Sequence, residues 1–258
     1  EVSYYDWQVG ELLKLLDKHG LQDNTLVMVV SEQGNAFPFA KWTCYENGVQ
    51  SAMVVRWPGN VKIGATTTAM VEYVDVVPTF IELAGGKPTP ILDGRSFLQV
   101  IRGQADRHKD YVYAEMTTRG IINGSDTFGI RSVRGERYKY ILNFTPEIEF
   151  RNACTKSREF KSWIAKAEAG DNDAADKVRR YVNRDGVELY DLEKDPYEWH
   201  NLAGKKQVKE VENILRKKLD EWMRSQGDRG QETELAARDR QGSGRQKKDK
   251  KGGRKKKG

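Results

Sequence analysis

Two short runs of apolar residues, both rich in valine, constrain the fold of this chain most strongly. They occupy residues 25–30 and 51–57. Runs of this kind predict strands that are buried on both faces, as in a parallel sheet. Apolar residues at helical spacing over residues 6–19 and 74–84 predict helices that would cover such a sheet. Because these helices alternate with the strands, the sequence predicts an α/β layered sheet.

The pattern changes after residues 111–115, which predict a third strand of that sheet. Residues 128–134 and 137–142 are strand-like and flank a short turn, which predicts a β-hairpin. Residues 187–192 predict another antiparallel strand, and residues 208–223 carry apolar side chains at helical spacing. The sequence thus predicts a smaller C-terminal antiparallel sheet with a packing helix.

These changes divide the chain into three predicted parts. Residues 1–115 form part of an α/β domain, residues 116–227 form a C-terminal subdomain, and residues 228–258 form a disordered tail. The tail is assigned from its composition, because it has few apolar side chains to bury. No apolar run approaches the ~18 residues that span a bilayer. No charged-then-apolar leader is recognisable, so neither a membrane span nor a signal peptide is predicted in this sequence.

The net charge of +6 resides in the tail. Residues 231–258 contain 11 Lys or Arg and 4 Asp or Glu, whereas the other 230 residues contain 33 basic and 34 acidic side chains. The body of the chain therefore gives no electrostatic reason to expect specific nucleic-acid recognition. The basic tail has no interleaved aromatic residues, so it would hold nucleic acid or an anionic glycan without sequence preference. The alternative is that it only increases solubility.

Polar side chains gather directly after the first predicted strand. Glu32 and Gln33 follow it, and Lys41 comes eight residues after Gln33. Ligands of α/β sheets bind beyond the carboxyl ends of strands. Carboxylate and amide oxygens suit Ca²⁺ or Mg²⁺, and Lys41 would then neutralise an anion held by the metal. The alternative is a polar turn with Lys41 in solvent. Arg119 follows the third predicted strand, where it would either contact an anionic sugar or remain solvated.

Seven segments in order make residues 2–227 resemble the C-terminal half of a type I sulfatase of the alkaline-phosphatase-like superfamily. Ser31-Glu-Gln-Gly34 resembles the S-D-[HN]-G metal motif, and Lys41-Trp-Thr-Cys-Tyr-Glu46 resembles K-x-x-x-Y-[ED]. The remaining matches are Trp7-Gln-Val-Gly10 with the segment 20–25, Arg56-Trp-Pro-Gly59, Asp75-Val-Val-Pro-Thr79, Asp93-Gly-Arg-Ser96, and Glu188-Leu-Tyr-Asp-Leu-Glu-Lys-Asp-Pro-Tyr-Glu198 with Asn201-Leu202. The Phe37-Pro38 insert resembles the branch that contains N-sulfoglucosamine sulfohydrolases.

The resemblance implies a sulfuric ester hydrolase that acts on sulfated carbohydrates. In such enzymes a formylglycine hydrate attacks sulfur, and one Ca²⁺ holds the sulfate oxygens and the nucleophile. By match, Glu32 and Gln33 would be calcium ligands, and Lys41 would be a catalytic residue that contacts the sulfate or the leaving oxygen. Glu replaces the Asp of the motif and Gln replaces its His or Asn. Both changes keep oxygen donors, which the loose coordination geometry of calcium tolerates.

The nucleophile segment of that family, C/S-x-P-x-R, does not occur in this sequence. The nearest string, Cys154-Thr-Lys-Ser-Arg158, has Lys where the motif needs Pro. Cys154 and Cys44 are therefore predicted to be structural, and the charged loop around His108 predicts an exposed histidine. The chain is expected to be a fragment with little activity alone, from a periplasmic or secreted enzyme. The alternatives are a non-catalytic polyanion-binding module and a phosphate or phosphonate ester hydrolase of the same superfamily.

Overall fold

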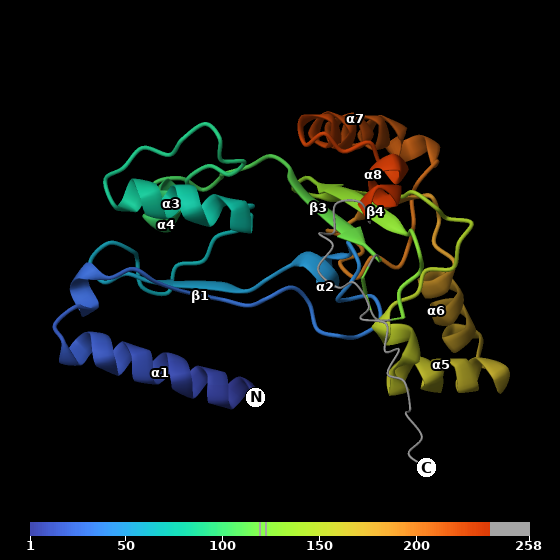
Figure 1. Cartoon of the computed structure of the whole chain (residues 1–258), viewed down its shortest axis with the longest axis horizontal. Helices are drawn as coiled ribbons and strands as arrows, with labels where there is room; N and C mark the ends of the chain where they lie inside the picture. The colour runs from blue at the N-terminus through green and yellow to red at the C-terminus, as the bar shows by residue number, and fades with distance from the viewer. Residues whose placement is uncertain (119, 122, 238–258) are drawn as a thin grey trace, which may run out of the picture.

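The computed structural model describes residues 1–118, 120–121 and 123–237 (Figure 1). Its first part contains α1 (Val2–Lys18), β1 (Val27–Val30), α2 (Glu46–Val49), β2 (Met53–Arg56), α3 (Val76–Leu83) and α4 (Leu98–Ile101). In the view of Figure 1, β1 is drawn between α1 and the α3–α4 pair, so the helices and strands form layers. The helices predicted over residues 6–19 and 74–84 are confirmed as α1 and α3.

The direction of the first two strands differs from the prediction. β1 and β2 pair antiparallel, with Val27 opposite Arg56 and Val30 opposite Met53. The chain between them reverses through the loop that carries α2, whereas a parallel pair needs a crossover connection. An apolar run shows that a strand is suited to burial but does not specify the direction of its partner. Val54, in the middle of β2, is 65% exposed.

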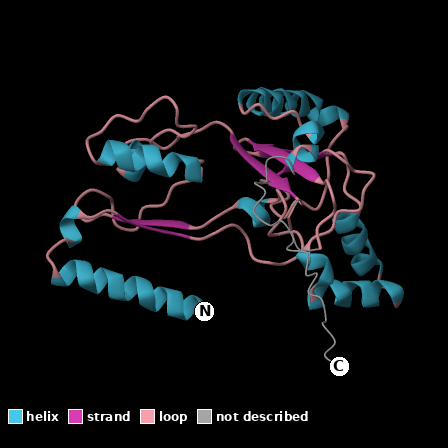
Figure 2. Ribbon diagram, viewed as in Figure 1, coloured by secondary structure: helices cyan, strands magenta, loops and turns pink. Residues whose placement is uncertain are grey.

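The second part is built on a four-stranded antiparallel sheet (Figure 2). Its strands, in spatial order, are β3 (Val112–Thr117), β4 (Gly129–Arg134), β5 (Tyr138–Asn143) and β6 (Val187–Asp191). The predicted β4–β5 hairpin and the predicted strand β6 are confirmed. The prediction that 111–115 joins the first sheet is wrong, because β3 pairs with β4, Val112 lying opposite Arg134.

Helices cover both faces of this sheet. Alternate residues of a strand point to opposite faces, so Ile141 of β5 packs with α5 (Arg158–Glu168) and α6 (Asn172–Val182), whereas Tyr140 packs with α7 (Lys209–Ser225). Leu215 and Leu219 carry the buried face of α7, at the spacing of one helical turn. Two apolar cores, one on each face, therefore pack against the sheet.

Part of the predicted tail is ordered. Residues 231–235 form α8 (Gln231–Leu235), and Arg131 of β4, only 4% exposed, ties this segment down. Its Nε lies 2.6 Å from an oxygen of Asp228, and its Nη2 lies 2.8 Å from an oxygen of Glu234. The prediction of disorder is therefore wrong for residues 228–237, because buried ion pairs rather than apolar side chains anchor them. The remainder of the predicted tail, 238–258, lies outside the described residues.

Candidate functional site

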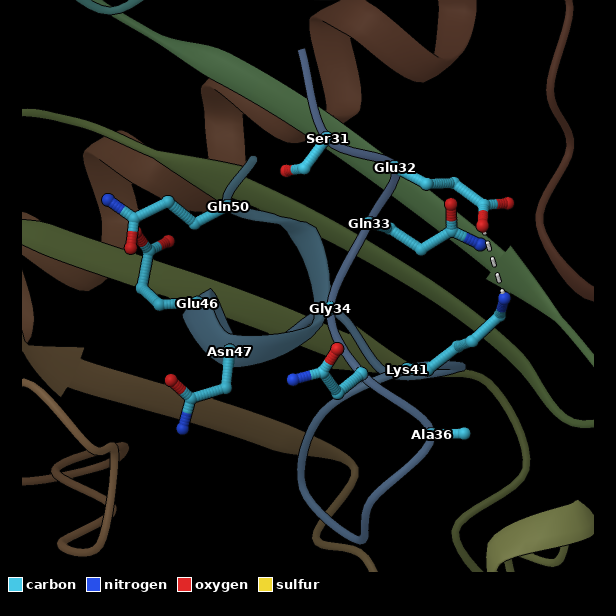
Figure 3. A pocket seen from close by; sticks show the side chains of 10 residues that line it. Ser31, Glu32, Gln33, Gly34, Ala36, Lys41, Glu46, Asn47 and Gln50 are labelled. Atoms are coloured by element: carbon cyan, nitrogen blue, oxygen red, sulfur yellow. Dashed lines mark ion pairs between the residues drawn. The ribbon is translucent and has the colours of Figure 1, made fainter. Parts of the chain in front are cut away.

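A cavity of about 510 Å³ lies at the carboxyl end of β1 (Figure 3). One wall is the segment 31–36 with Lys41, and the other is α2 with Gln50. Glu32, Gln33 and Lys41 all line this cavity. The structure thus brings together the three residues that the sequence indicates here, whereas Arg119 lies outside the described residues.

The charged side of the cavity is an ion pair whose two groups remain accessible to a ligand. Lys41 Nζ lies 3.5 Å from Glu32 Oε2, a separation that permits charge attraction but is too long for a hydrogen bond. The Glu32 side chain is 75% exposed, and that of Lys41 is 25% exposed. Figure 3 shows the Gln33 amide beside this pair. These groups offer carboxylate and amide oxygens and one ammonium to a ligand that enters from solvent.

The backbone of the loop touches α2 directly. A Cβ atom at Gly34 would lie 1.7 Å from the carbonyl oxygen of Asn47, so only glycine fits there. The Gly34 N–H donates to the Gly48 carbonyl at 3.1 Å, and the Lys41 N–H donates to the Asn35 carbonyl at 3.0 Å. The positions of Gln33 and Lys41 are therefore set by backbone contacts with their surroundings.

Two residues beside Lys41 have left-handed backbone conformations that non-glycine residues rarely adopt. Phe39 has φ of 62° and Trp42 has φ of 65°. The Phe39 ring packs among aromatic rings of the C-terminal subdomain, with centroids 5.1 Å from Tyr181 and 5.2 Å from Trp199. Such conformations persist where the surroundings fix them. The aromatic packing thus holds the loop that presents Lys41.

The donor set suits a hard cation in part. Among the described residues no group of three or more His, Cys, Asp or Glu side chains converges as a metal site. Glu32 and Gln33 supply two oxygen donors, whereas Ca²⁺ takes six to eight. These two donors would fill only one side of a Ca²⁺ coordination shell, and a complete shell would need further ligands.

A buried charge cluster beneath α2 was not predicted as part of the site. It comprises Glu46, Lys139 and Glu198, and Arg134 lies at its edge. Lys139 Nζ lies 2.8 Å from Glu46 Oε1 and 3.6 Å from Glu198 Oε1. Arg134 Nε lies 3.2 Å from Glu46 Oε2, and the Glu46 N–H donates to Glu198 Oε2 at 2.6 Å. Glu46 and Glu198 belong to recognisable motifs, but Lys139 resembles an ordinary exposed strand residue in the sequence.

The two carboxylates of this cluster titrate differently. Burial raises the pKa of Glu198 to about 7, although Lys139 and the Glu46 N–H oppose the shift. Burial also opposes ionisation of Glu46, but Lys139 and Arg134 outweigh it and hold the Glu46 pKa below its usual value. The difference arises because Glu46 faces two cations at close range, whereas Glu198 faces one at 3.6 Å.

The structure buries both cysteines and the side chain of His108. Cys44 and Cys154 are buried, as expected of structural cysteines. The prediction of an exposed His108 is wrong, since its side chain is 5% exposed and Nε2 lies 3.2 Å from Asp75 Oδ2. Burial lowers the pKa of His108. This histidine joins the loop before β3 to the start of α3 and does not line the cavity.

The chain is similar in sequence to known sulfatases. The model of the N-sulphoglucosamine sulphohydrolase C-terminal family matches residues 34–168. An ulvan-active sulfatase of Formosa agariphila is 36% identical over 221 residues, which cover 86% of this chain and 41% of that protein. The human N-sulphoglucosamine sulphohydrolase is 26% identical over 234 residues, covering 86% of this chain and 46% of the human protein. The chain thus spans less than half the length of these two relatives.

A solved structure of a protein in complex with its substrate D-glucosamine-2-N,6-O-disulfate has a similar fold. It superposes with a TM-score of 0.64 at 22% identity, over 86% of this chain and 39% of that one. Within the residues that the present structure describes, no helix has the length and apolar character needed to cross a membrane.

Proposed function

The chain belongs to the N-sulphoglucosamine sulphohydrolase C-terminal family, and from this membership we propose that it is the C-terminal part of a calcium-dependent sulfatase acting on sulfated carbohydrates. It has part of the alkaline-phosphatase-like fold of sulfatases. The relatives support the reaction, because one is an ulvan-active sulfatase and another an N-sulphoglucosamine sulphohydrolase. The family resemblance further supports a periplasmic or secreted enzyme.

The observation that carries this proposal is the grouping of Glu32, Gln33 and Lys41 in one cavity at the end of β1. A sulfatase must neutralise a sulfate group and stabilise the charge that grows on the leaving oxygen. Lys41 supplies a cation at the cavity wall, and its ammonium lies 3.5 Å from Glu32 Oε2. An isolated polar turn would need neither a buried backbone contact at Gly34 nor the left-handed conformations at Phe39 and Trp42.

In this proposal Glu32 and Gln33 hold one side of a Ca²⁺ ion, and Lys41 contacts the sulfate or the leaving oxygen. A bound Ca²⁺ would polarise the sulfate and orient it for attack. One oxygen of Glu32 would then bind the ion, while the other would remain near the Lys41 ammonium. Gln33 adds a neutral oxygen donor. Lys41 stabilises the departing oxygen as negative charge develops on it.

The attacking group lies outside this chain in the proposal, on a formylglycine in a preceding segment. Exposed apolar side chains in the first part support a missing neighbour, because soluble proteins rarely expose large apolar patches. Trp7 and Leu12 of α1 are 56% and 62% exposed, and Val54 of β2 is 65% exposed. We therefore expect this chain alone to hydrolyse sulfate esters weakly or not at all.

The test is release of inorganic sulfate by the full-length protein from sulfated monosaccharides, both O- and N-linked, with matched phosphate and phosphonate monoesters as competitors. We expect sulfate release that requires calcium and falls on Lys41→Met. Faster release from phosphate or phosphonate esters would instead favour that branch of the superfamily.

A binding role for the basic tail is the rival proposal. It is tested by truncation after residue 237, which keeps the ordered α8 and its ion pairs with Arg131. If polyanion binding is lost on truncation while no sulfate release is ever detected, the rival proposal is favoured.

A further inference from the structure

We propose that Lys139 is a positioning residue for this site, which holds Glu46 and thereby fixes α2 against the loop that carries Glu32, Gln33 and Lys41. The inference rests on the proposed function, because the loop matters only if it binds calcium and sulfate. Lys139 itself lines no part of the cavity. Its effect reaches the site through two contacts that hold Glu46 and a third that joins α2 to the loop.

The first contact is the buried pair between β5 and α2. The Lys139 side chain is 1% exposed, and its ammonium lies 2.8 Å from Glu46 Oε1. A buried ammonium requires a partner, because an unpaired charge in a protein interior is strongly unfavourable. Arg134, on the neighbouring strand β4, contacts the other oxygen of Glu46 at 3.2 Å. Two cations on neighbouring strands thus hold both oxygens of one carboxylate.

The second contact fixes the start of α2. The first N–H groups of a helix have no partner within the helix. Here the Glu46 N–H donates to Glu198 Oε2 at 2.6 Å. Glu198 has φ of 57°, and its other oxygen lies 3.6 Å from Lys139. Lys139 therefore contacts the carboxylate of Glu46 itself and the Glu198 carboxylate, which accepts from the Glu46 backbone.

The third contact transmits the position of α2 to the loop. Gly34 lies so close to the Asn47 carbonyl that a Cβ atom would be 1.7 Å from its oxygen. Gly34 also donates to the Gly48 carbonyl. This is contact of backbone with backbone, without a flexible side chain that could absorb a shift of α2. Any displacement of α2 consequently moves Gly34 and the adjoining Gln33.

The experiment compares Lys139→Met with Arg131→Met in the full-length protein. Both changes remove a buried cation of the same sheet. The close partners of Arg131 are Asp228 and Glu234, in the C-terminal segment, and Glu115 of β3 lies 3.6 Å from its Nε. The Kd for Ca²⁺ alone is measured by calorimetry, and kcat and KM are measured for sulfate release. Near-ultraviolet circular dichroism identifies a temperature at which both variants are folded.

Lys139→Met is expected to weaken calcium binding about 10-fold and to lower kcat by about 10- to 100-fold, the range seen when groups behind metal ligands are removed. Arg131→Met is expected to stay within about 2-fold of the wild type in both. Equal calcium affinity and kcat in Lys139→Met and the wild type would overturn the positioning role. An equal loss in both variants would overturn it as well, because the effect would then be general destabilisation.

Gly34→Ala provides a second route if Lys139→Met does not fold. It presses α2 and the loop apart without removing a buried charge, and it should weaken calcium binding by a similar factor. Wild-type calcium affinity in Gly34→Ala would show that α2 and the loop are not coupled, which refutes the inference. A wild-type protein that neither binds calcium nor releases sulfate refutes the proposed function itself, and the role of Lys139 fails with it.

Discussion

Replacing Glu32 by Gln tests the calcium assignment most directly. The two side chains have the same shape, so the change removes one negative charge and keeps an oxygen donor. In the absence of calcium, folding stability should hardly change. Glu32 is 75% exposed and its pair with Lys41 spans 3.5 Å, and exposed ion pairs contribute about 0–1 kcal/mol.

The loss in calcium affinity should be much larger. A carboxylate oxygen lies at roughly 2.4 Å from a bound Ca²⁺. Coulomb's law for charges of +2 and −1 at that distance gives about 3.5 kcal/mol in a water-like dielectric, which suits so exposed a group. The amide oxygen of Gln recovers part of this energy. A net loss of about 2.7 kcal/mol corresponds to about 100-fold weaker binding.

The assay is calorimetric titration of Ca²⁺ into the full-length protein, with thermal unfolding measured in chelator on the same samples. The matched control is Glu11→Gln, because Glu11 of α1 is also an exposed glutamate in an ion pair, 2.7 Å from Lys14. We expect the control to bind calcium like the wild type. If Glu32→Gln binds calcium with wild-type affinity, or if Glu11→Gln loses as much, Glu32 is not a ligand.

Three further outcomes follow from the packing and titration of the chain. Gly34→Ala should lower the free energy of unfolding by about 1–3 kcal/mol, since its Cβ meets the Asn47 carbonyl. Gly10→Ala, in α1 with nothing within 4 Å, should instead raise it by up to about 1 kcal/mol in urea titrations. Glu198 has a pKa raised to about 7, so the native state binds its proton more tightly and stability should fall as pH rises from about 4.5 to 7. Glu198→Gln should remove about 3 kcal/mol of that pH dependence; an unchanged slope would contradict the assignment. Arg131→Met should cost about 3–5 kcal/mol, and limited proteolysis should then cut within 228–237, which stays protected if the ion pairs do not anchor it.

Local sequence patterns identified individual strands and helices. The β4–β5 hairpin and α7 were predictable because alternation and helical spacing lie within a few consecutive residues. The partner of β3 was not, because β3 joins a sheet whose next strand begins beyond a loop of 11 residues. Strand direction in the β1–β2 pair was missed for a similar reason. An apolar run carries no information about the path of the chain that follows it.

In the candidate site, too, residues close together in the sequence were predictable, whereas contacts between distant residues were not. Glu32, Gln33 and Lys41 lie within ten residues of one another, so one strand end was sufficient to indicate them. The supporting charge cluster joins residues far apart in the sequence: Glu46 lies 93 positions from Lys139 and 152 positions from Glu198. His108 was misjudged because its partner, Asp75, lies on a different element. Charged residues in a loop or strand usually face solvent, and only the folded chain reveals which of them are buried with a partner.

The candidate ligands are exposed side chains on an unusually constrained backbone. Packing does not fix the Glu32 carboxylate, which is 75% exposed, so its placement depends on the segment that carries it. That segment is held by the Ser31 side chain, which accepts from the Ala52 N–H at 2.8 Å, and by Gly34 against α2. Preorganised sites need such support, because a displacement of about 1 Å is enough to loosen them. Substitutions at the exposed ligands should therefore impair binding without affecting stability, whereas substitutions at the supporting contacts should impair both.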